Sequence, residues 1–147
     1  MRRKQRACPE NDAWELLRSA RSYQLAMVSA AGEPMLRVMD GVVVDDWLLF
    51  HGAFAGEKSE GIGRACVASA HEVVALIPSH FVDPRKACPA TTYYRSVQVK
   101  GQLCDVTDER LKRGMLQGLM EKSQPEGGYV SFFDAEELYK QHLRAPR

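Results

Sequence analysis

Apolar side chains recur at helical spacing in two segments of the chain. The first segment follows Asp12, a residue type that caps helices, and the second runs from about Asp108 to Lys122, where the glycines and proline of 124–128 end it. In each segment the apolar side chains fall on one face of a helix with a period of 3.6 residues. We predict a short helix that closes one end of the core and a longer helix that packs over a sheet. The apolar faces consist of Ala13, Leu16, Leu17 and Ala20 in the first segment and of Leu111, Met115, Leu116, Leu119 and Met120 in the second.

Stretches rich in β-branched and aromatic residues, separated by turn residues, predict the strands. Glycine and proline mark a turn at 31–34, and the pair Asp45-Asp46 is typical of a tight hairpin turn. We therefore expect the first three strands to form an antiparallel meander in a sheet of five or six strands. Residues 57–64 favour a helical turn that two glycines weaken. The predicted strands are 25–29, 35–44, 47–51, 66–70, 72–77 and 94–103, with a long loop at 78–89.

A strand-rich pattern with helices near the start, middle and end of the chain is typical of an α+β fold. Such a sheet is most easily closed as a small antiparallel β-barrel with flanking helices. Because chains of this length commonly form one core, we predict a single domain over residues 1–147, with residues 1–11 as a flexible tail. We find no internal repeat or low-complexity stretch in the sequence.

The charge pattern argues against two classes of partner. Lys and Arg number 20 against 19 Asp and Glu, so the net charge of +1 creates no field that would hold a polyanion such as DNA. The basic residues at 2–6 are followed by Cys8-Pro9-Glu10 and not by the apolar stretch of a secretory signal. No run approaches the roughly 18 apolar residues that span a bilayer. We predict a cytoplasmic protein that binds neither nucleic acid nor membrane.

The cysteines are spread through the chain and form no C-x-x-C pair. This spacing argues against a disulfide framework and against a zinc knuckle. Histidines occur near two of the cysteines, but their separations match no zinc-binding spacing. We expect reduced thiols and no metal site. The residues considered are Cys8, Cys66, Cys88 and Cys104, with His71 and His80.

The segment 50–58, F-H-G-A-F-A-G-E-K, has the composition of a phosphate site. A histidine ends a strand, glycines follow it, and Lys58 stands where a helical turn is expected to begin. Glycine lets backbone amides approach an anion, a helix N-terminus offers N–H groups, and lysine adds a positive charge. From spacing alone, the alternative is favoured: the glycines shape a turn, and Lys58 is a surface lysine.

Two motifs in the same order give the sequence a family resemblance. F-H-G-A-x-A-G-E-K, followed by T-T-Y-Y-R-S-V-Q-V-K-G, resembles the FMN-binding split-barrel family of pyridoxamine 5'-phosphate oxidase-like proteins, including its nitroimidazole-resistance-like branch. A looser match runs from about Trp14 to Gly128. The resemblance implies an FMN-binding split β-barrel that forms a homodimer, with the flavin in a groove between the subunits.

The resemblance also implies which residues contact FMN. Lys58 would meet the phosphate. For Arg95 a surface ion pair is an equally good explanation, because the planar fork of arginine binds carboxylates as well as phosphates. The other expected contacts are Arg37, Val38 and Met39 beside the isoalloxazine ring, Phe50, His51, Gly52 and Glu57 along the flavin, and Ser96, with Arg95, at the phosphate or the ring edge.

His51 is the residue for which the resemblance suggests a catalytic role. An imidazole titrates near neutrality and could carry a proton during reduction of the flavin. A histidine that hydrogen-bonds a backbone group and shapes the flavin pocket is the favoured alternative. We therefore place His51 in the flavin lining first and in catalysis second.

Three functions remain open at this point. The first is an FMN-dependent oxidoreductase that takes electrons from NAD(P)H or a similar donor and acts on a small-molecule substrate. The second is a module that stores or senses a flavin or a haem, because one fold hosts many functions. The third is a dimeric protein without a cofactor. Proteins that the chain resembles continue into a further strand and a lysine-rich tail, whereas this sequence ends at Arg147, so we expect a truncated flavin site.

Overall fold

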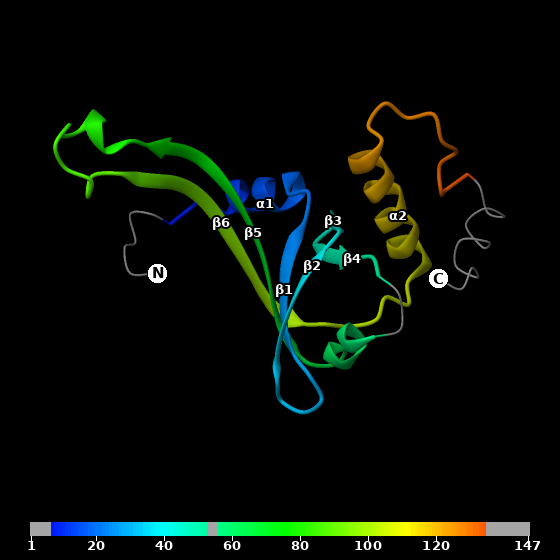
Figure 1. Ribbon diagram of the computed structural model, residues 1–147. Helices are drawn as coiled ribbons and strands as arrows, with labels where there is room; N and C mark the ends of the chain where they lie inside the picture. Colours follow the sequence, from blue (N-terminus) through cyan, green and yellow to red (C-terminus); the bar gives the residue numbers. More distant parts are fainter. Residues whose placement is uncertain (1–6, 53–55, 135–147) are drawn as a thin grey trace. The chain divides into compact units, whose positions relative to one another are not determined.

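The computed structural model describes residues 7–52 and 56–134, and in these ranges the chain forms helices and antiparallel strands (Figure 1). The α+β class predicted from the sequence agrees with this arrangement. None of the helices in the described ranges is long and apolar enough to cross a membrane. The elements are α1 (Glu10–Ser19), β1 (Tyr23–Val28), β2 (Pro34–Met39), β3 (Gly41–Val44), β4 (Trp47–Phe50), the 3₁₀ helix η2 (Glu57–Gly61), β5 (Ala65–Ile77), the 3₁₀ helix η3 (Ser79–Phe81), β6 (Thr91–Gln102) and α2 (Glu109–Ser123).

The strands form two sheets. One has the order β2-β1-β5-β6, and the other is the hairpin β3-β4. β1 and β2 are antiparallel, with Tyr23 opposite Met39 and Val28 opposite Pro34. The predicted three-stranded meander is therefore wrong, because the stretch 35–44 is not one strand but breaks at Asp40.

The break at Asp40 arises from contacts with β4 and with His51, the residue that follows β4. The Asp40 carbonyl accepts a hydrogen bond from the backbone N–H of His51 at 3.2 Å, outside the ladders of the two sheets. The next residue, Gly41, lies so close to β4 that an added Cβ would stand 2.7 Å from the Leu49 carbonyl oxygen. A residue with a side chain would clash there, so glycine allows the chain to leave β2 and pair with β4.

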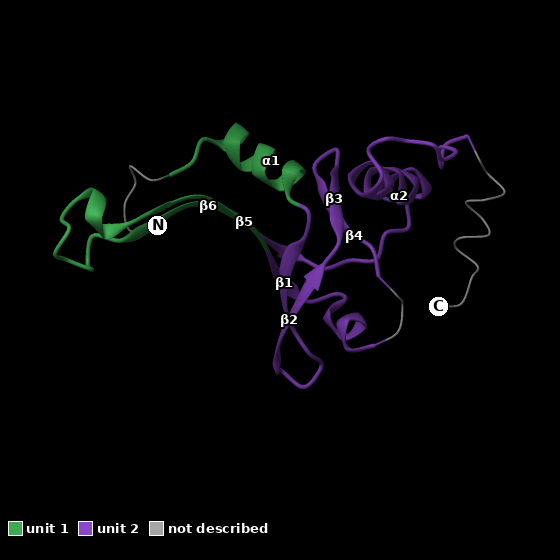
Figure 2. Cartoon of the chain, turned by 45° about the horizontal axis from the view of Figure 1, so that its top comes forward, with its two compact units in different colours: residues 1–20, 69–98 green, residues 21–68, 99–147 purple. Residues whose placement is uncertain are grey.

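Contacts within the chain divide it into two compact units (Figure 2). Unit 1 comprises residues 1–20 and 69–98, and unit 2 comprises residues 21–68 and 99–147. Both β5 and β6 contribute residues to each unit. The prediction of a single domain stays a prediction.

Unit 1 contains α1 and the outer part of the β5–β6 hairpin. The helix begins after Pro9, not after Asp12 as predicted, and Asp12 lies in its first turn, where a carboxylate interacts favourably with the helix dipole. Leu16 and Leu17 are buried, which confirms the centre of the predicted apolar face. β5 is continuous from Ala65 to Ile77, so the two separate strands predicted in this stretch are one.

Unit 2 has its core around β1. Leu25, Met27 and Ala68 are buried together, and less buried apolar side chains surround them. Tyr23, at the start of β1, is 1% exposed, and its ring packs edge-on against Phe50 with the ring centroids 5.8 Å apart. The surrounding side chains are Met35, Met39, Leu48, Phe50, Cys66 and Leu103.

The helix α2 covers the strand β3, as the sequence predicts for a helix packed over a sheet. Its N-cap is Asp108, whose side chain accepts hydrogen bonds from the backbone N–H groups of Arg110 and Leu111 at 2.7 and 3.1 Å. Near its other end, the Nζ of Lys122 donates to the Gly41 carbonyl at 2.9 Å and lies 3.3 Å from the Tyr23 hydroxyl. The helix is thus held at both ends.

Candidate functional site

A pocket of about 400 Å³ lies in unit 2 between the end of β2 and the start of η2. Its volume is within the range of small-molecule and cofactor sites. The lining brings together two groups of residues that the sequence analysis proposed separately. They are Arg37, Val38 and Met39 on β2, and Glu57 and Lys58 on η2, with Gly56 between the groups.

The two apolar side chains of β2 that line the pocket differ in burial. Met39 packs against the core cluster of unit 2, whereas the neighbouring Val38 is 72% exposed. Successive side chains of a strand point to opposite faces, so β2 offers an exposed apolar side chain next to a core one. An exposed valine in a pocket is a surface on which an apolar ring can lie.

Lys58 lies across Gly52. A Cβ added at Gly52 would stand 2.6 Å from the Lys58 Nζ, which is closer than such contacts occur in proteins. Because Gly52 has no side chain, the Lys58 ammonium group fits beside it. Among the residues that the structure describes, no carboxylate forms an ion pair with Lys58, so its charge is available to an anion.

Arg37 is the second cation of the pocket, and it is already engaged. Its Nη2 forms an ion pair with the Glu57 carboxylate, and its Nη1 donates to the Leu36 carbonyl at 2.8 Å. The side chains of Arg37 and Glu57 are 40% and 70% exposed. The pocket thus contains two cationic groups and one carboxylate.

The element that presents Glu57 and Lys58 is shorter than predicted. η2 is a 3₁₀ helix of 5 residues, not a helical turn over 57–64. Its first turn is closed by the Ser59 N–H and Oγ, which donate to the Gly56 carbonyl at 3.0 and 2.7 Å. Gly56 has φ +108°, a value that favours glycine. Since the element is too short to act as a helix N-terminus, anion binding here depends on the side chains of Arg37 and Lys58.

Gly56 lines the pocket but was not among the predicted contacts. Its signal in the sequence is the A-G-E-K motif, in which the glycine precedes the two predicted residues. The opposite end of η2 is fixed by Gly61, which is buried and packs against the Met27 side chain. Glycine at both ends therefore sets the position of η2 in unit 2.

Phe50 and His51 are close in sequence to residues that line the pocket, but they do not line it themselves. Phe50 belongs to the core and contacts Tyr23. His51 follows β4, is half-buried, and donates its backbone N–H to Asp40. Their roles as flavin contacts, and the catalytic role of His51, stay predictions.

Arg95 and Ser96 lie on β6 in unit 1. The Glu72 carboxylate accepts hydrogen bonds from the Arg95 Nη2 and Nε at 2.6 and 3.2 Å. This hydrogen bonding, with the charge of Glu72 and smaller contributions from Glu15 and Asp12, raises the pKa of Arg95. A phosphate would have to compete with Glu72 for this guanidinium, so the phosphate contact predicted for Arg95 stays a prediction, as does that of Ser96.

The cysteines and histidines show no metal centre in the part of the chain that the structure describes. No group of three or more His, Cys, Asp or Glu side chains lies close enough together to hold an ion. The four cysteines are free thiols.

Comparison with protein families gives a match over most of the chain. Residues 9–145 match the family described as pyridoxamine 5'-phosphate oxidase. No curated protein matches the sequence.

Solved structures with the same fold come from several bacteria. A conserved hypothetical protein from Mycobacterium tuberculosis has a TM-score of 0.70 at 16% identity, covering 97% of this chain and 78% of that chain. An FAD and haem binding protein from Mycobacterium smegmatis has a TM-score of 0.67 at 20% identity, covering 96% and 60%. A candidate 5-nitroimidazole antibiotic resistance protein from Bacteroides thetaiotaomicron has a TM-score of 0.67 at 15% identity, covering 88% and 75%.

The family match and the structural similarities agree on the fold. The α+β fold of the described residues, with antiparallel sheets and the helices α1 and α2, is a split β-barrel. The fold class predicted from the sequence is confirmed. At identities of 15 to 20%, the solved structures show the fold alone.

Proposed function

We propose that this chain, which belongs to the pyridoxamine 5'-phosphate oxidase family, binds FMN in the pocket of unit 2 and acts as a flavin-dependent oxidoreductase on a small molecule. One observation carries the proposal. Arg37 and Lys58, two cationic side chains, share a pocket with the apolar Val38 and Met39. FMN combines a planar, largely apolar ring with a phosphate, so it needs both kinds of group in one place.

The residues of the pocket fit such a ligand. Lys58 has no ion-pair partner within the described residues and would meet the phosphate, and Gly52 leaves room for its ammonium group. Arg37 would add a second charged contact, because its fork can bind two phosphate oxygens. Val38 and Met39 would lie beside the ring. When bound, the flavin supplies hydride transfer, and the chain's residues bind it, orient it and exclude water from it.

The contacts predicted for Phe50 and His51 form part of the same proposal. Phe50 and His51 would line the flavin from the end of β4, and His51 would be the residue to carry a proton if one is transferred at the ring. The flavin contacts expected of Arg95 and Ser96, on β6 in unit 1, stay predictions of the family resemblance. Electrons would come from NAD(P)H or a similar donor and pass to a small-molecule substrate.

We also propose a homodimer with the flavin between two copies of the chain, in the cytoplasm. The outer β5–β6 hairpin of unit 1 supports the dimer, because it exposes many large apolar side chains. Free thiols at all four cysteines support a reducing compartment.

A second candidate function is a module that binds a flavin or a haem without turnover. The similarity to an FAD and haem binding protein favours it as the alternative, because the two chains share a fold. Turnover separates the two candidates. An oxidoreductase oxidises NAD(P)H in the presence of FMN and an electron acceptor, whereas a binding module shows the bound spectrum without steady oxidation.

The first test is the visible absorption spectrum of the purified protein before and after addition of FMN and removal of the excess. It is followed by a fluorescence titration with FMN of the wild type and of Lys58→Ala. Loss of a charge-assisted contact with the phosphate should weaken binding by roughly 1.5–3 kcal/mol, or about 10- to 150-fold.

A matched control removes a different lysine. Lys100 is exposed on β6, so Lys100→Ala should bind FMN as the wild type does. Equal affinity of Lys58→Ala and the wild type would show that Lys58 does not hold the phosphate. Absence of bound flavin even at high FMN concentration would contradict the proposed function itself.

A further inference from the structure

The Glu57 carboxylate lies in a pocket that we propose for an anionic ligand. It forms an ion pair with Arg37, one of the two cationic groups that line the pocket. A carboxylate and a phosphate both bind the fork of a guanidinium group, so they compete for the same donors. Glu57 therefore occupies a group that the phosphate of a ligand would use.

We propose that Glu57 lowers the selectivity of this pocket for phosphorylated ligands by competing with their phosphate for Arg37, an inference that rests on the proposed function. A phosphate monoester carries close to two negative charges at neutral pH and gains a contact with both Arg37 and Lys58 when it displaces Glu57. A neutral flavin without phosphate gains no ionic contact from the displacement. Glu57 thus lowers the affinity for phosphorylated ligands and leaves that for unphosphorylated ones unchanged, so the difference between the two affinities becomes smaller.

The surroundings of Arg37 allow the exchange without movement of the backbone. The Glu57 side chain is 70% exposed, so its carboxylate can return to water with little loss of solvation. Arg37 keeps its second hydrogen bond, from Nη1 to the Leu36 carbonyl at 2.8 Å, when Glu57 leaves. The guanidinium therefore stays at the pocket.

The backbone of η2 is fixed independently of the ion pair. The Ser59 N–H donates to the Gly56 carbonyl at 3.0 Å at its start, and Gly61 packs against Met27 at its end. Only the Glu57 side chain needs to move. Lys58 stays over Gly52 in both arrangements and remains available to the ligand.

The test compares the wild type with Glu57→Gln in titrations with FMN, with riboflavin and with inorganic phosphate. Removal of the competing charge should tighten FMN and phosphate binding about two- to fivefold, the effect of an exposed ion pair, and leave riboflavin binding unchanged. The matched control is Glu60→Gln, which makes the same charge change on η2. Its carboxylate accepts a hydrogen bond from the Ala30 N–H at 3.2 Å and is outside the pocket lining, so FMN binding should not tighten.

A double-mutant cycle connects the effect to Arg37. In an Arg37→Gln background, Glu57→Gln should give no gain in FMN affinity, because the contested donor is absent. The inference is overturned if the gain has the same size with and without Arg37, if riboflavin gains as much as FMN, or if FMN gains nothing.

Failure of the proposed function gives a different result. If the wild type binds neither FMN nor riboflavin, FMN is not the ligand, and the phosphate titration alone decides the role of Glu57. Tighter phosphate binding by Glu57→Gln than by the wild type would support competition for Arg37. Equal phosphate binding, or none in either protein, would overturn it.

Discussion

Tyr23 and Lys122 form a buried polar contact at the junction of β1, β3 and α2. Burial raises the pKa of Tyr23 to about 12, while burial lowers the pKa of Lys122 despite the opposing charge of Asp40. The Lys122 Nζ lies 5.3 Å from the centre of the Tyr23 ring and donates to its hydroxyl. Both groups therefore titrate differently in the folded and unfolded chains, and stability at alkaline pH depends on them.

The sign of the Tyr23 effect follows from its raised pKa. The unfolded chain loses this proton near pH 10, whereas the folded chain keeps it to about pH 12. The free energy of unfolding should fall between these pH values by about 2–3 kcal/mol on account of Tyr23. Lys122 has the opposite effect on the free energy of unfolding, which should rise with pH below the ordinary lysine pKa of 10.5. The reason is that the folded chain releases this proton at a lower pH than the unfolded chain. Urea unfolding at several pH values from 8 to 12 measures the combined effect of Tyr23 and Lys122 on the free energy of unfolding.

Tyr23→Phe isolates the phenol, because it keeps the buried ring and removes the titrating group. The variant should lose about 1 kcal/mol at pH 8 from the missing hydrogen bond, and should lack the alkaline decline that the wild type shows. Tyr93→Phe changes a tyrosine that is 59% exposed and should leave the wild-type profile unchanged. An identical alkaline decline in the wild type and Tyr23→Phe would rule out Tyr23 as its source.

The sequence predicted some residues of the pocket but not the contacts between them. Lys58 and the group 37–39 were found through a motif and its family, and the structure brings them into one lining. The ion pair between Arg37 and Glu57 was not found, because 20 positions separate the two residues and nothing local in either segment indicates the other. Pairing across elements depends on tertiary structure, which residue type and spacing do not encode.

At the scale of elements, two glycines set the distance between α2 and β3. A Cβ added at Gly114 would stand 3.1 Å from the Val44 Cγ1, and one at Gly118 would stand 3.3 Å from the Val42 Cγ1. Side-chain conflicts therefore limit what these positions accept. In many soluble helices, two glycines four residues apart have no special role, but here they allow α2 to approach β3 closely.

The graded series Gly114→Ala and Gly114→Leu tests this packing by thermal or urea unfolding. Alanine gains up to about 1 kcal/mol of helix propensity and needs a small shift of Val44, so it should be close to neutral. Leucine gains a similar propensity but overfills the contact, so it should destabilise the protein by about 1–3 kcal/mol. Stabilisation by leucine equal to its propensity gain would mean that α2 does not approach β3 at this position.

Element type followed from local pattern, whereas element boundaries followed from contacts between elements. The period of the apolar residues gave both helices, and the predicted start of the second at about Asp108 was correct, because the Asp108 side chain caps its own helix. The break at Asp40 was missed, because it arises from the contact of Gly41 with β4. β5 was predicted as two strands because position 71 interrupts its apolar run, yet an exposed strand accepts a polar residue there.

At the scale of the molecule, two motifs were enough to indicate the family and the split-barrel fold. The first motif carries this information because it places glycines and charged residues at the connection from β4 to η2, where the backbone restricts the choice of residue. The second motif runs along β6. The division into two units could not be predicted. β5 and β6 each supply residues to both units, so no linker or change in composition marks a boundary.

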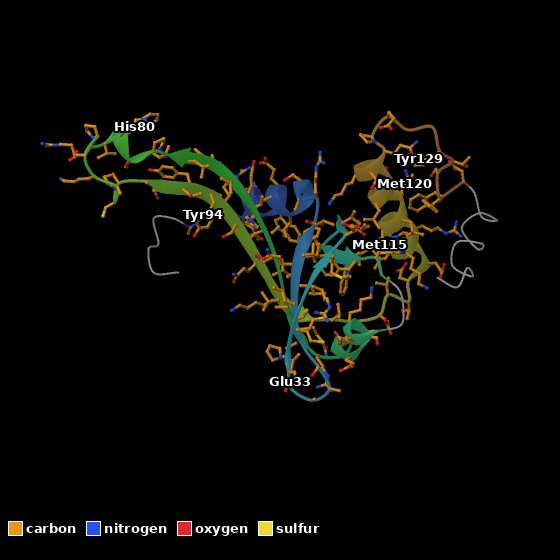
Figure 3. All side chains as sticks on the ribbon, in the orientation of Figure 1. Glu33, His80, Tyr94, Met115, Met120 and Tyr129 are labelled. Atoms are coloured by element: carbon orange, nitrogen blue, oxygen red, sulfur yellow. The ribbon has the colours of Figure 1, made fainter. Side chains whose placement is uncertain are left out.

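The outer β5–β6 hairpin of unit 1 has an unusual surface for a single copy of the chain. Successive residues of a strand point to opposite faces. In this hairpin the neighbours Val73 and Val74 are both more than half exposed, so apolar side chains are exposed on both faces. Tyr94 lies on β6 and His80 in η3 at the tip (Figure 3). Large exposed apolar patches mark interaction sites, which supports association of two copies. The exposed side chains are Val73, Val74, Leu76, Phe81, Val82, Tyr93 and Tyr94.

The double variant Val74→Lys/Leu76→Lys tests the dimer, because residues two apart share one face of β5 and lysines there would place charges in an apolar contact. Sedimentation equilibrium should give a dimer for the wild type and a shift toward monomer for the variant, with circular dichroism to verify folding. Trp47→Lys replaces an apolar side chain of similar exposure, 59%, on β4 and should leave the dimer intact.

A wild type that is monomeric at tens of micromolar would contradict the homodimer, whereas a dimer that both variants retain would place its interface outside the hairpin. Because the flavin is proposed to lie between two copies, a hairpin-mediated dimer should also lose FMN affinity in the double variant but not in Trp47→Lys.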